Sequence, residues 1–264
     1  MRETVGAPVP FRARGFAPRD VPWASAATLV GVVLLWQAGA SAGLLSTKFL
    51  PAPAQIVRAL VDLTVSGELW LHLSASLRRL AIGWLVGTVV GLALGFAVGL
   101  STLARSPGMA IVSALFPIPK IALVPLFIIW FGIGEGSKVI TLAFGVFFPT
   151  VINTLAGVDG VSRGLIRMGQ SFGLSRAAII RKIVLPGALP AILSGFRITT
   201  STAIILLVAA EMIGAEKGIG AFVLSAGNLY DTDNLLAGIV VLSLIGLAVS
   251  WVLGWIERAL LAWR

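Results

Sequence analysis

The sequence contains no cysteine, a single histidine and few charged residues. The absence of cysteine among 264 residues excludes disulfides, thiolate metal sites and cysteine nucleophiles. Charged residues make up 12% of the chain, about half the fraction usual in soluble domains, and hydrophobic residues make up 58%. His72 has no nearby set of metal or catalytic ligands, so we interpret it as structural. This composition indicates a membrane protein.

Apolar residues occur in runs of about 20, the length that an α-helix needs to cross a bilayer. We therefore expect an all-α, polytopic membrane protein with a single transmembrane domain over residues 23–264 and a disordered cytoplasmic tail over residues 1–22. A Pro-punctuated amphipathic segment in residues 46–73 predicts a short interfacial helix that ends near His72. The six predicted spans are residues 23–45, 74–100, 108–131, 139–156, 191–213 and 235–255.

Residues 157–190 form a long basic segment between two spans. Val161, Leu165 and Met168 recur at helical spacing in its first half. Ser175 is a candidate N-cap for a second short helix, whose apolar face is Ile179, Ile180, Ile183 and Val184. Gly173 allows a tight reversal between the two helices, and Leu185-Pro186 is expected to end the second one. This pattern favours a docking element over a catalytic site.

Glycine recurs at every fourth position of the second span. Such rows allow helix backbones to approach closely in lipid. We expect packing within one subunit, with a subunit interface as the alternative. The row consists of Gly83, Gly87, Gly91, Gly95 and Gly99.

Two ionisable residues lie within or at the edge of predicted spans. Lys120 stands among Pro117, Pro119 and Pro125, and Glu211 ends the fifth span. Because a charge in a membrane is costly, Lys120 is expected to face a passage, or else to reach outwards from near an interface. The nearby FGIGEGSK is not a phosphate-binding loop, since Ser137 separates the glycine from the lysine, and we expect a turn between helices.

The basic residues indicate the orientation. Thirteen of the 20 lysine and arginine residues lie on the side of the two termini, the 101–107 turn and the 157–190 segment. The positive-inside rule places that side, with both termini, in the cytoplasm. The charge excess is thus explained without nucleic acid as a partner.

The basic segment resembles the cytoplasmic coupling loop of ABC-importer permeases. Gly173, Ile183, Leu185 and Pro186 match the spacing of its signature, while Arg167-Met168-Gly169 replaces Glu-Ala-Ala. The resemblance covers residues 48–264 and is to the nitrate/sulfonate/taurine-type branch. It rests on FLPAPAQIV, SLRRLAIGW, FPIPKIALVPLFIIWFGIGEGSK, FFPTVINTLAGV, VAAEMIGAEKGIG and WIERALLAWR.

The resemblance implies a homodimer in the bacterial cytoplasmic (inner) membrane. It further implies two cytoplasmic ATP-binding subunits, which hold ATP and magnesium, and an extracytoplasmic substrate-binding protein. This chain would itself carry no cofactor and no enzyme activity, and would pass a small anionic solute. The expected passage residues are Pro117, Pro119, Lys120 and Glu211. The residues expected to couple to the ATPase are Gly169, Gly173, Leu174, Ser175, Arg176, Leu185 and Pro186.

Two other classes of function need features that the sequence has in short supply. A standalone secondary transporter or channel would need intramembrane carboxylates or inverted repeats, and Glu211 is the one plausible embedded acid. A membrane enzyme would need catalytic groups gathered at one depth, whereas the acids here are scattered.

Overall fold

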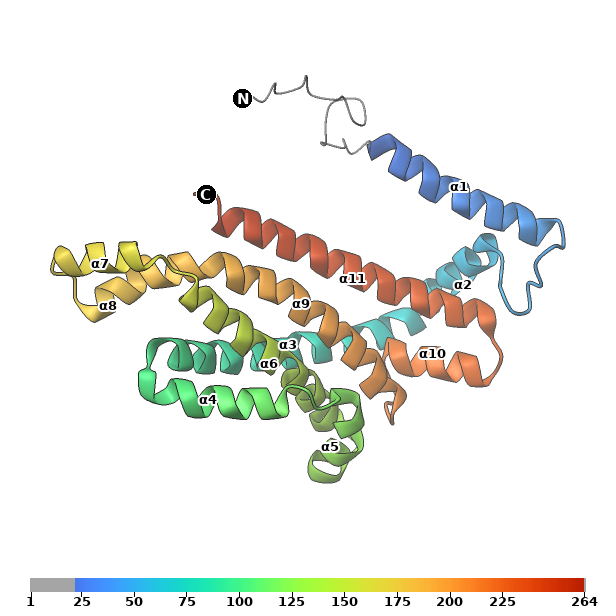
Figure 1. Ribbon diagram of the computed structural model, residues 1–264. Helices are drawn as coiled ribbons and strands as arrows, with labels where there is room; N and C mark the ends of the chain where they lie inside the picture. Colours follow the sequence, from blue (N-terminus) through green and yellow to red (C-terminus); the bar gives the residue numbers. More distant parts are fainter. Residues whose placement is uncertain (1–21, 264) are drawn as a thin grey trace, which may run out of the picture. The chain divides into compact units, whose positions relative to one another are not determined.

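The computed structural model describes residues 22–263, and this part of the chain consists of helices joined by turns (Figure 1). The all-α prediction is therefore confirmed. The predicted tail, residues 1–22, lies outside the described residues except for Pro22, which begins the first helix. The chain divides into two compact units, residues 1–55 and 56–264.

The first unit contains α1, Pro22–Ser41, and the first residues of α2, Pro53–Val65. Residues 23–41 are apolar and long enough to cross a membrane. The N–H of Ala54 donates to Oε1 of Gln37 (3.1 Å) and ties the start of α2 to α1.

The second unit contains the remainder of α2 and all later helices. Three long helices, α3, α6 and α9, form its centre, and buried residues of all three join one hydrophobic cluster with α10 and α11. The later helices are α3 Glu68–Leu100, α4 Thr102–Leu115, α5 Val124–Phe131, α6 Glu135–Asp159, α7 Arg163–Ser171, α8 Arg176–Ile179, α9 Leu185–Met212, α10 Ile219–Asn228 and α11 Thr232–Leu260. A 3-10 turn, Lys120–Leu123, precedes α5, and a π turn, Ile180–Val184, joins α8 to α9.

Five helical segments in the described part are long and apolar enough to span a membrane. They are Trp23–Ser41, Glu68–Leu100, Glu135–Asp159, Arg176–Met212 and Thr232–Leu260. The predicted third span is broken into two helices, α4 and residues 120–131, and the chain bends by 86° between them. Pro117 and Pro119 lie at this break, where their missing N–H groups interrupt the helical hydrogen bonds. Counting the bent pair as one span brings the total to six.

The prediction that the short helix in residues 46–73 ends near His72 was wrong. The short helix there is α2, and His72 belongs instead to the second turn of α3. The reason is Gly67, whose left-handed backbone (φ +84°) separates the two helices and lets α3 begin at Glu68. An acidic residue in the first turn suits the helix dipole.

The glycine row of α3 lies directly against α6 within this chain. A Cβ atom added at Gly83 would come within 2.6 Å of the Cβ of Leu142, and one at Gly95 within 2.6 Å of the Cβ of Thr154. Contacts advance in the same direction along both helices, so α3 and α6 are parallel. The row therefore allows two helix backbones of one subunit to touch.

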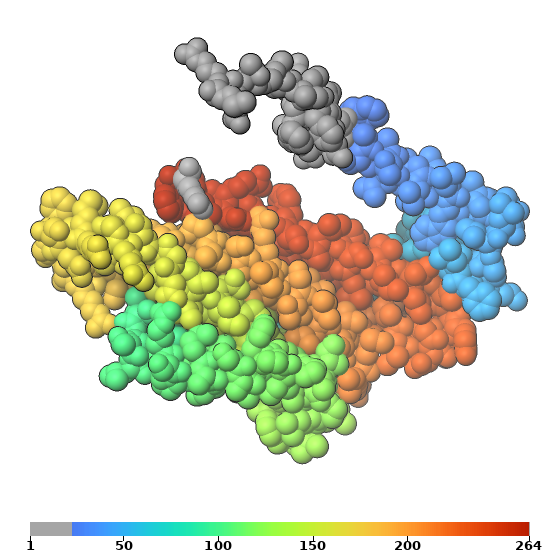
Figure 2. Space-filling view, in the orientation of Figure 1, coloured from blue at the N-terminus to red at the C-terminus, as the bar shows by residue number. Residues whose placement is uncertain are grey.

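The helix α9 runs antiparallel to α6, because Gly157 of α6 meets Ala188 and Gly145 meets Leu206. The ion pair between Arg197 and Glu257 (2.5 Å) places the last turns of α11 beside the first part of α9. The end of α11 thus lies at the same end of the unit as α7 and α8, and α10 lies at the other end, as Figure 2 also shows.

Candidate functional site

The turn between α7 and α8 is a regular helix end. Gly173 has a φ of +70°, the left-handed conformation that glycine adopts without strain. The N–H of Leu174 donates to the carbonyl of Gly169 (3.0 Å), and that of Gly173 to the carbonyl of Gln170 (2.9 Å). These are the two hydrogen bonds of a Schellman motif. The predicted reversal at Gly173 is confirmed.

Ser175 caps α8, as predicted, since its Oγ accepts a hydrogen bond from the N–H of Ala178 (3.2 Å). The helix does not end at Leu185-Pro186, however, and this prediction was wrong. A continuous helical segment runs from Arg176 to Met212 through the π turn. In the π turn the N–H of Leu185 donates to the carbonyl of Ile180, five residues back. The wider turn accommodates Pro186, whose ring would crowd the preceding turn of a regular α-helix.

Gly169 is the point where α7 crosses the π turn. A Cβ added there would lie 2.9 Å from Cδ1 of Ile183 and 3.4 Å from Cγ1 of Ile179. Ile179 also belongs to a buried cluster with Val161 and Val184. The two short helices therefore form one packed element, which we call the α7–α8 element (residues 163–184).

The outer face of the α7–α8 element is apolar and basic. Leu165, Met168 and Phe172 are 48%, 50% and 78% exposed, and Arg163 and Arg167 are exposed among them. This corrects the predicted apolar face of the first helix: Val161 is buried, but Leu165 and Met168 point away from the core. The inward side is formed by Ile166 and Gly169 instead.

The residues predicted to couple to the ATPase fall into two groups. Gly169 is buried and Leu174 and Pro186 are half-buried, whereas Gly173, Ser175, Arg176 and Leu185 are exposed. Arg176 has a second contact that the sequence did not reveal: its Nη2 donates to the carbonyl of Leu100 (2.8 Å), the last residue of α3. An arginine there satisfies a free carbonyl at a helix C-terminus.

An ion pair between Arg105 and Asp159 lies at the same end of the unit as the α7–α8 element. Arg105 in the first turn of α4 donates from Nη1 and Nη2 to the two carboxylate oxygens of Asp159 (2.8 and 2.5 Å), the last residue of α6. Both residues are half-exposed. The ends of α3, α4 and α6 are thus connected to one another and to the α7–α8 element.

The four predicted passage residues do not form one cluster. Pro117, Pro119 and Lys120 lie together at the break of the third span, with both prolines exposed and Lys120 half-buried. The ammonium of Lys120 donates to the carbonyl of Phe116 and lies 4.5 Å from the ring centroid of Phe116. It also lies 5.9 Å from the ring centroid of Phe148 on α6, within cation–π range.

Glu211 lies elsewhere, at the far end of α9, and is fully buried. Its carboxylate accepts hydrogen bonds from Ser76 Oγ (2.8 and 2.9 Å), Arg79 Nη1 (2.8 Å) and the N–H of Gly220 (2.9 Å). The opposite edge of Arg79 donates from Nε (2.8 Å) and Nη2 (2.5 Å) to Glu135, the first residue of α6. One guanidinium therefore connects α3, α6 and α9.

The pairing of Arg79 with Glu211 was not predicted from the sequence. The two residues are 132 positions apart, and no local pattern relates them. The sequence feature that could have indicated a partner for Arg79 is its position directly before a long apolar run. A buried charge in a membrane helix requires a partner.

Lys138, one turn into α6, hydrogen-bonds to the loop before α6 and to the loop after α9. Its ammonium donates to the carbonyls of Ile133 (2.5 Å), Gly134 (3.1 Å) and Gly214 (3.1 Å). The predicted turn in FGIGEGSK is therefore confined to residues 132–134, and α6 begins at Glu135.

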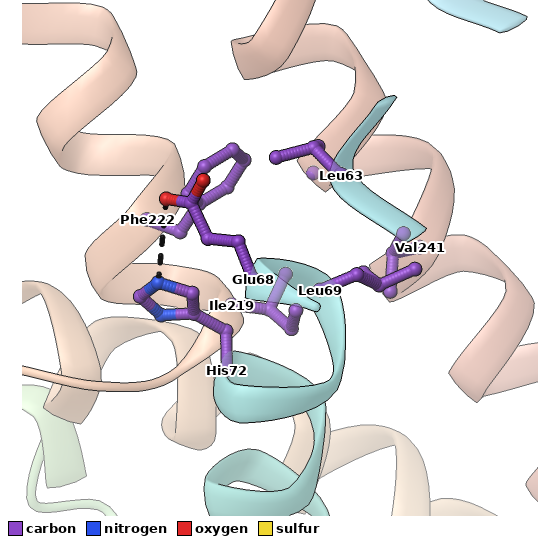
Figure 3. Close-up of a pocket in the computed structure, with 8 residues that line it drawn as sticks. Leu63, Glu68, Leu69, His72, Ile219, Phe222 and Val241 are labelled. Carbon is purple, nitrogen blue, oxygen red and sulfur yellow. Dashed lines mark ion pairs between the residues drawn. The ribbon is translucent and has the colours of Figure 1, made fainter. Parts of the chain in front are cut away.

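His72 contributes to packing near this end. The N–H of Gly218 donates to its Nδ1 (3.1 Å), and its ring lies 5.3 Å from that of Phe222. Its Nε2 lies 3.9 Å from Oε1 of Glu68, one helical turn earlier. Figure 3 shows this pair beside a small apolar pocket. Within residues 22–263, no group of three histidine, aspartate or glutamate side chains is placed to hold a metal ion.

Comparison with solved structures supports this arrangement of helices. The chain is similar to a chain of the MetNI methionine ABC transporter in inward-facing conformations, with a TM-score of 0.63 and 22% sequence identity. The match covers 74% of this chain and 98% of that chain. At this level of identity the likeness concerns the fold.

Sequence comparison gives nearer relatives. The chain is 40% identical over 235 residues to the aliphatic sulfonates transport permease protein SsuC of Escherichia coli (strain K12), covering 89% of each chain. It is 39% identical over 247 residues to the taurine transport system permease protein TauC of the same organism, covering 91% of this chain and 89% of that one. A family model, described as binding-protein-dependent transport system inner membrane component, matches residues 87–262. The chain belongs to this family of transport-system inner membrane components.

Proposed function

We propose that this chain is the membrane-spanning permease subunit of an ATP-driven importer for a small aliphatic sulfonate such as taurine. The observation that carries the proposal is the α7–α8 element, a packed projection with an apolar and basic face. Family membership and the identity to SsuC and TauC support the solute class.

The α7–α8 element is suited to transmit the movement of a bound subunit to the membrane spans. It follows α6 after a short turn and continues into α9 without a helix end. Through Arg176 it also holds the last carbonyl of α3. A force on its outer face would therefore act on three long helices as one body, as a rigid-body change of access requires.

We assign the outer face to contact with a cytoplasmic ATP-binding subunit. ATP and magnesium would be held by that subunit, and a second copy of the chain and a binding protein would complete the importer. The end that carries the α7–α8 element also holds Arg105, Arg163, Arg167, Arg181 and Lys182, a basic surplus that favours the cytoplasmic side of the bacterial inner membrane.

For the passage we propose the break at Pro117, Pro119 and Lys120. An ammonium near two aromatic rings at an interrupted helix could interact with a sulfonate. In this proposal Glu211 does not line the passage, and it acts by holding together the helices that it connects.

The environment of Glu211 argues against a standalone proton-coupled transporter. A proton carrier needs a carboxylate that can be protonated and exposed in turn. Glu211 is fully buried, and its carboxylate is enclosed by three donors, Ser76 Oγ, Arg79 Nη1 and the N–H of Gly220, which leave it no access to solvent in this structure.

A direct test of the docking assignment uses Phe172→Glu, which places a charge on the outer face. We expect loss of co-purification of the cognate ATP-binding subunit, because a carboxylate would be desolvated in an apolar contact. The matched control is Leu229→Glu, at the opposite end of the unit with similar exposure (74% against 78%). Retention of the subunit by Phe172→Glu, or equal loss in both variants, would contradict the assignment.

A further inference from the structure

A charged cleft lies at the end of the second unit opposite the α7–α8 element. Its volume is about 330 Å³, and it opens between the turn that precedes α6 and the loop that follows α9. Its walls carry basic and acidic side chains together with loop backbone. The lining residues are Arg79, Ile133, Gly134, Glu135, Lys138, Gly214, Ala215, Glu216 and Lys217.

The guanidinium of Arg79 has one fixed edge and one edge at the cleft. Nη1 donates inwards to the fully buried Glu211 (2.8 Å) and to the carbonyl of Lys217 (2.5 Å). Nε and Nη2 donate together to Glu135. The side chain of Arg79 is only 3% exposed, so the protein holds this pair of donors in place. Two parallel N–H groups of a guanidinium match the oxygens of a carboxylate or another oxyanion.

Glu135 is the exchangeable member of this group. Its side chain is 45% exposed, in contrast to the buried Glu211. It follows Gly132, in a left-handed conformation (φ +78°), and Gly134, and added Cβ atoms at both glycines would have no neighbour within 4 Å. Arg78, 63% exposed and 3.3 Å from the Glu135 carboxylate, can remain with it outside the cleft. A Glu135 carboxylate displaced from Arg79 would therefore remain accessible to solvent.

Lys138 makes the cleft more favourable to an anion without occupying it. Its three donors are taken by the three loop carbonyls, so it fixes the walls and contributes a positive charge. The start of α6 adds the positive end of a helix dipole. When Glu135 moves away, the remaining charges and dipole favour a replacement anion.

We propose that this cleft binds the sulfonate or carboxylate group of a small solute, which takes the place of Glu135 on the outer edge of Arg79. The cleft volume is at the lower end of small-molecule pockets and suits a solute of a few heavy atoms. The cleft is thus a solute site separate from the break at Lys120. The proposal rests on the proposed function for the choice of solute, but the site itself is a property of this chain.

The test is equilibrium dialysis of radiolabelled ethanesulfonate with the full-length chain in detergent. Glu135→Gln is expected to tighten binding about fivefold, because it removes a charged competitor of the strength of a partly exposed ion pair. The matched control is Glu216→Gln, which removes the same charge from another wall of the cleft and is expected to change binding less than about twofold. Should Glu135→Gln fail to fold, Glu135→Ala has the same expectation, since it also removes the carboxylate that pairs with Arg79.

Two results would overturn the site. One is unchanged or weaker binding in the Glu135 variant, which would make its pair with Arg79 a permanent link between α3 and α6. The other is an equal gain in both variants, or competition by the neutral ethyl methyl sulfone, which would remove the specific role of the oxyanion. Failure of the proposed function would look different: ATP-driven uptake by the assembled complex would be absent while Glu135-dependent binding to the chain persisted.

Discussion

At the scale of single residues, the interior of this chain contains a buried carboxylate that is paired with an arginine. Glu211 is completely buried, and its partner Arg79 is nearly so. Removing Glu211 would leave Arg79 with Glu135 as its remaining carboxylate partner and its buried Nη1 without a charged one. The pair therefore matters to stability through the cost of breaking it.

We expect Glu211→Gln to lower the free energy of unfolding by about 1–3 kcal/mol, because Arg79 would keep Glu135 but lose the charged partner of its buried Nη1. The measurement is the thermal unfolding midpoint in detergent. Glu257→Gln is the control, since its pair with Arg197 is partly exposed (29% and 59%) and should contribute less than about 1 kcal/mol. Equal shifts in the two variants would argue against this role of Glu211.

At the scale of helices, stability comes from close contact between backbones. The glycine row of α3 leaves no room for side chains against α6. In lipid, where water exclusion does not drive helices together, this packing is a main source of association.

Gly91→Ala is expected to destabilise the protein by about 1–3 kcal/mol through overpacking. The added Cβ would lie 2.7 Å from the Cβ of Thr150 and 2.9 Å from the carbonyl oxygen of Phe147. Gly31→Ala in α1 provides the control, because a Cβ there would have no neighbour within 4 Å. Thermal unfolding of the two variants compares them, and a Gly91→Ala protein as stable as Gly31→Ala would show that α3 and α6 are farther apart.

The α7–α8 element should tolerate one added methyl group at Gly169 but not a larger side chain. In Gly169→Ala the methyl meets the flexible end of Ile183 at 2.9 Å, which can shift. In Gly169→Leu the added atoms would separate α7 from the π turn. We expect binding of the ATP-binding subunit to persist in the first variant and to fall at least about tenfold in the second, measured by co-purification at graded subunit concentrations. Equal binding by both would mean that the packing of the element is irrelevant to docking.

The elements that could be predicted from the sequence depend on nearby residues. Gly173 and Ser175 act through hydrogen bonds to atoms within five positions, so their roles follow from residue type and spacing. The continuation of the helix through Leu185-Pro186 could not be predicted in this way, because it depends on a π turn packed against Gly169 of another helix. The pair of Arg79 and Glu211 is a tertiary contact with no local signal.

At the scale of the whole chain, the second unit has two ends of different character. One end carries the α7–α8 element, tied to α3 by Arg176, with the Arg105–Asp159 pair beside it. The other carries the buried pair of Arg79 and Glu211 and the charged cleft. In our account the first end receives force from an ATPase and the second receives the solute.

The absence of cysteine allows the central claim to be measured directly with single-cysteine variants. Phe172→Cys and Leu229→Cys place exposed thiols at opposite ends of the unit. With a membrane-impermeant maleimide in spheroplasts, the account predicts labelling of Leu229→Cys in intact cells and of Phe172→Cys only after lysis. Labelling of Phe172→Cys in intact cells would place the α7–α8 element outside, beyond the reach of any cytoplasmic ATPase, and would contradict the account.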